Sequence, residues 1–226
     1  KRLISVDGTV KWLYQTHDGH HIETVLIPTN DRFSVCVSTQ IGCAQNCAFC
    51  RTAKMGFIRN LEAGEILEEI IRVNWYLEET GTKHSDGSLA KVTNIIFMGM
   101  GEPLNNLEQV HRVCCTLHHQ KLFNLGRKRM TISTSGVVPK IKELVDRNTP
   151  CCLAVSLNST NDERRSAVMP VNKVWNIAKL LEATDEYTKR TGNYVTFEFV
   201  LMKGITCSEE AAKELIRICA PRRCKV

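Results

Sequence analysis

Three cysteines stand within one short segment, Cys43-Ala-Gln-Asn-Cys47-Ala-Phe-Cys50. Three thiolates so close in sequence can converge on one soft metal centre, and iron–sulfur clusters and zinc are the candidates. A structural zinc site needs a fourth ligand, usually from a second cysteine or histidine pair, and no such pair is evident. The alternative without a metal is that the three cysteines are buried residues of the core. We therefore expect a 4Fe–4S cluster at Cys43, Cys47 and Cys50, with one iron left open to a further ligand.

The rest of the chain alternates short apolar strands with amphipathic helices, a pattern typical of parallel βα units in an open sheet or a partial barrel. The helix over Ala63–Glu79 is predicted from apolar residues at helical spacing. The other predicted helices are a stripe through Val110, Val113, Cys114 and Leu117, then Pro139–Arg147, Val174–Arg190 and a segment capped by Ser208 that ends at Cys219. The predicted strands are Phe33–Ser38, Val92–Met98, Arg129–Thr134, Cys152–Ser156 and Tyr194–Leu201.

The two ends of the chain differ from this pattern. Val10–Gln15 and His21–Ile27 flank a turn and predict a β-hairpin, so residues 1–32 are interpreted as a hairpin extension and residues 33–226 as an α/β partial barrel. The last residues, Cys224–Val226, predict the start of a further strand. Because the first residue is Lys1 and a parallel sheet ending here would expose an edge, we expect a central fragment of a longer protein.

Composition and charge limit the partners and the cellular compartment that we expect. The chain has 226 residues and a formal net charge of +6, which permits a nucleic-acid partner without establishing one. Its eleven cysteines are an odd number and include two adjacent pairs, unlike a disulfide framework. No apolar run reaches the roughly 20 residues of a membrane span, and no signal peptide opens the chain. We expect a protein of the reducing cytoplasm with no membrane partner.

Glycine, serine and acidic residues gather where three predicted strands end. One strand runs into Gly99-Met-Gly-Glu-Pro-Leu104, the next into Ser133-Thr-Ser-Gly136, and the third into Ser156-Leu-Asn158. Parallel βα folds bind ligands at this edge of the sheet, and glycines there let the backbone approach a ligand. Glu102 could accept hydrogen bonds from a cationic amino group, although a plain turn is the alternative reading.

The cysteine segment, with the aromatic Phe49 before its last cysteine, is identified as the signature of the radical S-adenosylmethionine (SAM) superfamily. Together with other stretches it resembles the RlmN and Cfr family of RNA methyltransferases, from about Lys11 onward. Pro103 and Ser135 favour RlmN over Cfr. The matching stretches are Glu23-Thr-Val-Leu-Ile-Pro28, Cys36-Val-Ser-Thr-Gln-Ile-Gly-Cys43, Met98-Gly-Met-Gly-Glu-Pro103, Ser133-Thr-Ser-Gly136 and Met169-Pro-Val-Asn-Lys173.

The resemblance implies an enzyme that methylates carbon 2 of an adenine in 23S rRNA, and in some tRNAs, with a 4Fe–4S cluster and SAM. One SAM methylates a cysteine and a second supplies a 5′-deoxyadenosyl radical. A flavodoxin-like or ferredoxin-like electron donor and a monomeric state are also expected. The alternatives are a Cfr-like enzyme acting on carbon 8, a radical SAM enzyme with a small-molecule or peptide substrate, and a non-catalytic RNA-binding remnant.

The resemblance also implies roles for single residues. Glu23 stands at the position of the family's proton acceptor, and Cys36 at that of a cysteine that pairs with the methyl-carrying cysteine. No residue through Val226 matches that carrier. Without the resemblance, Glu23 reads as a solvated carboxylate and Cys36 as a core residue. The residues implied to line SAM are Gly101, Glu102, Ser133, Ser156, Leu157 and Asn158, the last in place of the family's usual histidine.

Basic residues near the predicted site suit phosphate contacts. They are Arg51, Lys54, Arg59, Arg164 and Arg165. By contrast, the run Arg127-Lys128-Arg129 precedes a strand, so we place it on the opposite, solvated side of the sheet. Trp75 and Trp175 are expected in helices and in the core.

Overall fold

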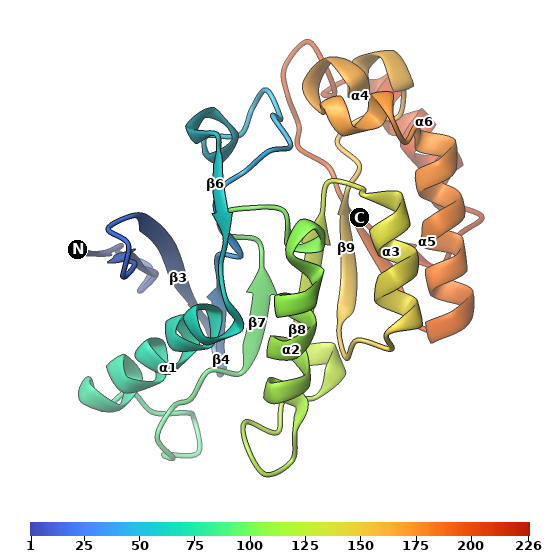
Figure 1. Ribbon diagram of the computed structural model, residues 1–226. Helices are drawn as coiled ribbons and strands as arrows, with labels where there is room; N and C mark the ends of the chain where they lie inside the picture. Colours follow the sequence, from blue (N-terminus) through green and yellow to red (C-terminus); the bar gives the residue numbers. More distant parts are fainter.

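Nine strands form one sheet in the computed structural model, which describes residues 1–226 (Figure 1). The strands are β1 (Arg2–Ile4), β2 (Val10–Gln15), β3 (His21–Thr29), β4 (Arg32–Cys36), β7 (Asn94–Phe97), β8 (Met130–Thr134), β9 (Cys152–Ser156), β10 (Val195–Glu198) and β11 (Cys224–Lys225), in that spatial order. β1 to β4 pair antiparallel, and from β4 onward every pairing is parallel. The predicted α/β class, the hairpin and the last strand are confirmed, and hairpin and parallel strands share one sheet.

Helices join the parallel strands, and α1, α2 and α3 lie along one face of the sheet (Figure 1). The helices are α1 (Ala63–Glu79), α2 (Leu107–His118), α3 (Val138–Asp146), α4 (Asp162–Val168), α5 (Ile177–Thr191) and α6 (Glu209–Cys219). α1 has the predicted bounds. α5 begins three residues later than predicted, because the Asn176 side chain caps it by accepting from the Lys179 amide. None of these helices combines the length and the hydropathy that a membrane span requires.

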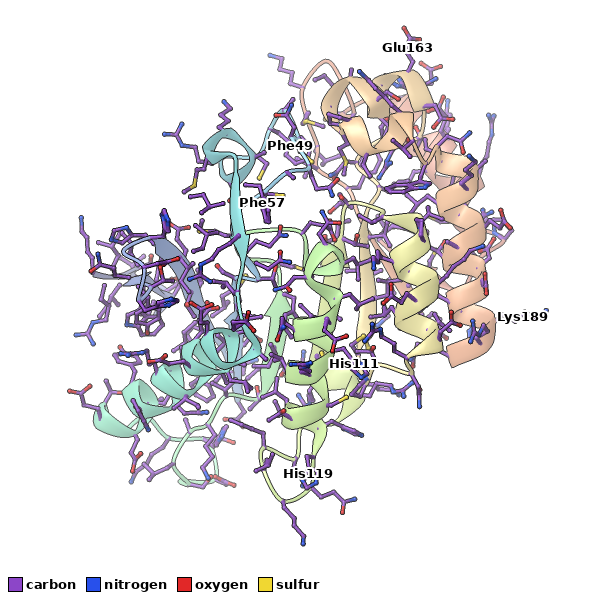
Figure 2. The ribbon with its side chains drawn as sticks, in the orientation of Figure 1. Phe49, Phe57, His111, His119, Glu163 and Lys189 are labelled. Carbon is purple, nitrogen blue, oxygen red and sulfur yellow. The ribbon has the colours of Figure 1, made fainter.

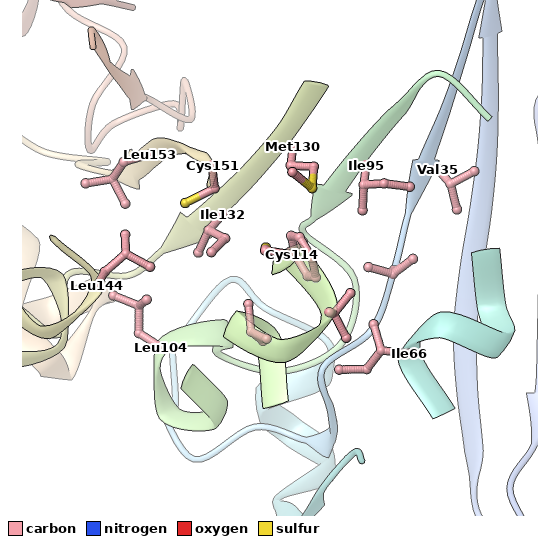
Figure 3. Packing of buried hydrophobic residues seen from close by; sticks show 14 of the residues in the cluster. Val35, Ile66, Ile95, Leu104, Cys114, Met130, Ile132, Leu144, Cys151 and Leu153 are labelled. Carbon is pink, nitrogen blue, oxygen red and sulfur yellow. The ribbon is translucent and has the colours of Figure 1, made fainter. Parts of the chain in front are cut away.

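The sheet separates a closed apolar face from an open polar one. Ile95, Ile132 and Leu153 lie on neighbouring strands and are fully buried against the helices (Figure 3). Each such side chain contributes about 1.5–3 kcal/mol of transfer free energy when buried. Successive residues of a strand point to opposite faces, so Ser133 of β8, Ser156 of β9 and Glu198 of β10 point the other way. That second face, called here the inner face, carries the site.

One core prediction is wrong. Trp75 is 61% exposed, because the buried stripe of α1 runs through Ile66, Ile70 and Val73 and leaves position 75 on the solvent side. Trp175 lies in the connection before α5 rather than in a helix, and it packs against the core while half-buried.

Candidate active site

A hollow of about 270 Å³ opens at the carboxyl ends of β7, β8, β9 and β10. One side of it is the cysteine loop, residues 43–50, and the other is the turns that follow these strands. Seven of the predicted site residues come together here: Cys43, Cys47, Cys50, Gly101, Glu102, Ser133 and Ser156.

The cysteine loop is suspended between two anchors. On one side stands a small hairpin of β5 (Gln40–Gly42) and β6 (Phe57–Asn60), where the Cys43 amide donates to Gly56 O at 2.9 Å. Figure 2 shows Phe49 on the loop and Phe57 on β6. On the other side, the Ala48 amide donates to Val168 O at the end of α4. The loop has no regular structure of its own between these two bonds.

Gly42 is required where the loop begins. Its φ of +73° lies in the left-handed region, and a Cβ there would stand 1.7 Å from the backbone oxygen of Gly56. Only glycine lets β5 approach β6 this closely, and Cys43 follows directly.

The three loop thiols occupy a small volume. Burial raises the pKa of Cys43 and raises that of Cys47 to about 12, and charge on the neighbouring thiols adds to both shifts. No three His, Cys, Asp or Glu side chains of the chain are arranged as they would be around a single metal ion. A 4Fe–4S cluster spreads its ligands more widely than one ion. Three neighbouring thiols that line one hollow are the kind of soft donors that a 4Fe–4S cluster takes.

Glu102 braces the strand-end turns. It is only 3% exposed, and its carboxylate accepts from the amide and hydroxyl of Ser135, each at 2.8 Å, and from the Leu104 amide at 3.1 Å. Burial raises its pKa, which these hydrogen bonds oppose. The carboxylate thus ties the turn after β7 to the turn after β8. Its contact with a ligand amino group stays a prediction.

Gly101, next to Glu102, brings that turn against the segment before the cysteine loop. Its φ is +103°, and a Cβ would stand 2.6 Å from the Cβ of Gln40. The Gln40 side chain accepts from the Glu102 amide at 2.8 Å. The glycine therefore positions the two sides of the hollow relative to each other.

Glu198, at the end of β10, is a site residue that the sequence interpretation missed. Its carboxylate accepts from the Ser133 hydroxyl at 2.8 Å and from the Ser156 hydroxyl at 3.3 Å, and it lines the hollow. A signal was present: Val195 and Phe197 are apolar and buried toward the helices, so the alternation places Glu198 on the inner face.

Arg165 corrects another prediction. It is fully buried, so it does not contact phosphate, and burial lowers its pKa to about 10. Its guanidinium donates to the backbone oxygens of Ser135, Ser156 and Leu157 at 2.7, 3.0 and 2.9 Å, and to the Asn172 side chain at 3.0 Å. These bonds hold the turns after β8 and β9 together from below the hollow.

Leu157 and Asn158 do not bring their side chains to the hollow. Leu157 is a core residue, and the Asn158 side chain donates to Met169 Sδ at 3.4 Å and accepts from the Val200 amide at 3.0 Å. Both backbone amides donate to Glu198 O. Ligand contact from this turn would therefore come from Ser156 or from the backbone.

Glu23 and Cys36 lie beside the hollow on the inner face. Val25 pairs with Cys36, and Glu23 is two residues from Val25, so all three share that face. Lys11 holds the Glu23 carboxylate at 2.6 Å, and that side chain is 41% exposed. Burial raises the pKa of Cys36 to about 11, which a hydrogen bond with the backbone of Met98, a residue of the hollow, opposes.

A parallel sheet whose strand ends face a three-cysteine loop is the arrangement expected of a radical SAM fold. The sequence pattern of the radical SAM superfamily matches residues 37–216. The chain therefore belongs to the radical SAM superfamily, as its cysteine spacing predicted.

Within the superfamily, the chain is similar to methyltransferases over nearly its whole length. The chain is 44% identical over 216 residues to "Dual-specificity RNA methyltransferase RlmN 2" of Myxococcus xanthus (strain DK1622), covering 96% of the chain and 56% of that protein. It is 42% identical over 226 residues to the RlmN of Bdellovibrio bacteriovorus, covering 54% of that protein. A crystal structure of a radical SAM methyltransferase from Sphaerobacter thermophilus superposes with a TM-score of 0.92 at 42% identity, covering 99% of the chain and 64% of the other. The chain spans a little over half the length of these curated relatives.

Proposed function

We propose that the chain carries the radical-forming site of an RNA methyltransferase that acts on carbon 2 of an adenine in 23S rRNA, and in some tRNAs. One observation carries the proposal: the three loop thiols and the turns after β7, β8 and β9 line one hollow. The relatives named as RNA methyltransferases support the substrate class.

Within this proposal, Cys43, Cys47 and Cys50 hold a 4Fe–4S cluster. A cluster held by these three thiols would supply the electron for reductive cleavage of SAM to a 5′-deoxyadenosyl radical. Ser133, Ser156 and Glu198 face the hollow with two hydroxyls and a carboxylate, a set that can bind the hydroxyl groups of SAM.

The base is modified on the inner face beside the hollow. An adenine ring carbon of this kind is electrophilic, so a methyl-derived radical carried on a cysteine suits it better than an electrophilic methyl group. Glu23, which is accessible and held by Lys11, accepts the ring proton. After the adduct radical has passed one electron to a one-electron acceptor, the Cys36 thiolate attacks the carrier sulfur. A disulfide forms, the bond from that sulfur to the methylene carbon breaks, and the methylene takes a proton to become the methyl group of the product. Because burial keeps the pKa of Cys36 near 11, its thiol must lose a proton before that attack.

Of the five basic residues predicted to contact phosphate, Arg165 is buried and two others are paired, which leaves two free cations. Arg59 is occupied by Asp18 at 2.6 Å and by Glu65, while Arg164 is paired with Glu214 at 2.7 Å. Arg51 and Lys54 are exposed beside the cysteine loop and have no carboxylate within salt-bridge distance. We assign the phosphate contacts to these two residues.

Comparing ribosomal RNA from source cells with and without the gene tests the function. Mass spectrometry of digested RNA should show 2-methyladenosine only when the gene is present. Loss of 8-methyladenosine instead would favour a Cfr-like enzyme, and unchanged RNA would contradict the proposal. In vitro, we expect this chain, loaded with cluster and reduced, to form 5′-deoxyadenosine from SAM.

The phosphate contacts predict a salt effect. Replacing Arg51 and Lys54 together by alanine should weaken RNA binding and reduce the slope of log affinity against log salt by about 0.7–0.9 per cation. Arg164→Ala is the matched control, because Glu214 already neutralises that charge. An equal change of slope in both variants, measured by fluorescence anisotropy over a salt series, would contradict the assignment.

A further inference from the structure

A carboxyl group is buried on the opposite side of the sheet, behind Glu23 and Cys36. Glu69 lies on α1 and is 2% exposed. It accepts a hydrogen bond from the Thr24 hydroxyl on β3, and both its oxygens lie 3.1–3.2 Å from the Ser38 amide that follows β4. One side chain therefore joins a helix to the two strand segments that flank the predicted proton acceptor and thiol.

Ser38 extends this connection to the hollow. It is fully buried, its hydroxyl donates to the backbone oxygen of Glu23 at 2.7 Å, and it accepts from the Met100 amide at 3.1 Å. Met100 belongs to the glycine turn, which packs so closely that a Cβ at Gly99 would stand 2.6 Å from Val37 O. A bonded path thus runs from Glu69 through Ser38 to Glu23 and to the turn that borders the hollow.

Glu69 forms no ion pair. The titratable groups whose charge is coupled to that of Glu69 are Glu65, Tyr14 and Cys36, none of them cationic at neutral pH. A larger hollow on this side of the sheet is lined by Glu69 and also by Lys1, His17, His21, Glu68 and Arg72. Arg72 is bonded to Glu68 instead. Burial raises the pKa of Glu69 well above its usual range, and a buried carboxyl without a cation binds a proton rather than keep its charge.

We propose that Glu69 is an uncharged positioning residue that fixes the strand carrying Glu23 against the glycine turn. The Glu23 carboxylate is thereby held at one position beside the hollow. The part that concerns Glu23 rests on the proposed function. The Thr24 hydroxyl can donate to a carboxylate or, with its proton rotated away, accept from a protonated carboxyl. A neutral Glu69 can therefore donate to the Thr24 oxygen and accept from the Ser38 amide, and a glutamine side chain can do both. A carboxylate can only accept.

Infrared spectroscopy of the full chain tests the charge state without any activity. With ¹³C-labelled glutamate at pH 7, the wild-type protein should show the isotope-shifted band of a protonated carboxyl, and Glu69→Gln should lose it. Glu68→Gln, one position away on the exposed side of α1, is the matched control and should keep the band. A spectrum with carboxylate bands only would overturn the proposal.

Hydrogen exchange tests the positioning. Glu69→Ala should raise the exchange rates of amides in residues 22–25, 37–40 and 98–101 by tenfold or more, and Glu69→Gln should stay within about threefold of wild type. Exchange in Glu69→Gln as fast as in Glu69→Ala would contradict the proposal. If Glu69→Ala does not fold, the infrared spectra of the wild-type protein and of Glu69→Gln still test whether Glu69 is protonated.

Restoring the gene to the deletion cells gives the functional readout. Glu69→Gln should return 2-methyladenosine to near the wild-type level, and Glu69→Ala should leave it at least tenfold lower at equal protein abundance. If the wild-type gene itself restores no 2-methyladenosine, the proposed function has failed. The infrared and hydrogen-exchange results then still test the charge state and the positioning role of Glu69.

Discussion

The two sides of the hollow are built in different ways. The strand-end side is cross-linked by side chains: Glu102 joins two turns, Glu198 joins two serines, and Arg165 binds three backbone oxygens. The cysteine loop has three thiols, no regular structure, and a backbone bond at each anchor. The polypeptide alone completes the first side, whereas the second is expected to be completed by the cluster it binds.

The largest expected effect is on the loop side. Replacing Cys43, Cys47 or Cys50 by alanine should abolish the loading of about four iron and four sulfide per chain during anaerobic reconstitution, because each thiol is one of three ligands. The same variants should leave the thermal stability of the cluster-free protein nearly unchanged. Cys114→Ala, in the core beneath the sheet, should load normally. Stoichiometric zinc with no iron uptake would refute the cluster.

Substitutions on the strand-end side should instead lower the stability of the cluster-free protein. Arg165→Met leaves buried backbone oxygens without a donor, so the unfolding free energy should fall on the order of 3 kcal/mol. Denaturant titration of the cluster-free protein measures this. Arg164→Met removes a partly exposed ion pair and should cost about 0–1 kcal/mol. Equal losses in the two variants would show that the network is not what holds this side.

A smaller effect is expected on the affinity for SAM. Glu102→Ala removes the acceptor of the Ser135 amide and hydroxyl and frees the turn that borders the hollow. SAM binding should weaken by about 1.5–3 kcal/mol, the range for hydrogen bonds to charged groups. Calorimetric titration of the cluster-loaded protein gives the value. Unchanged affinity would mean that the glycine turn after β7 has a structural role only.

Local patterns were sufficient for the main helices and strands and for the prediction that the three loop cysteines line one site. The α1 stripe and the cysteine spacing are set by residues near one another in sequence, and the structure agrees with both. Positions that depend on distant partners were not predictable in this way. Arg165 was predicted to contact phosphate, and no local pattern marks Glu69 as a buried residue with a role. Only the packed fold shows that three carbonyl groups accept from Arg165 and that a hydroxyl and an amide bond to Glu69.

Gly42 has a consequence for how the protein tolerates change. It does not line the hollow, yet every other amino acid would place an atom inside the contact with Gly56 and push β5 from β6. Cys43 would be displaced with it. A library of random variants selected for activity should therefore keep glycine at position 42 as strictly as it keeps the three cysteines, although a list of active-site contacts would omit it.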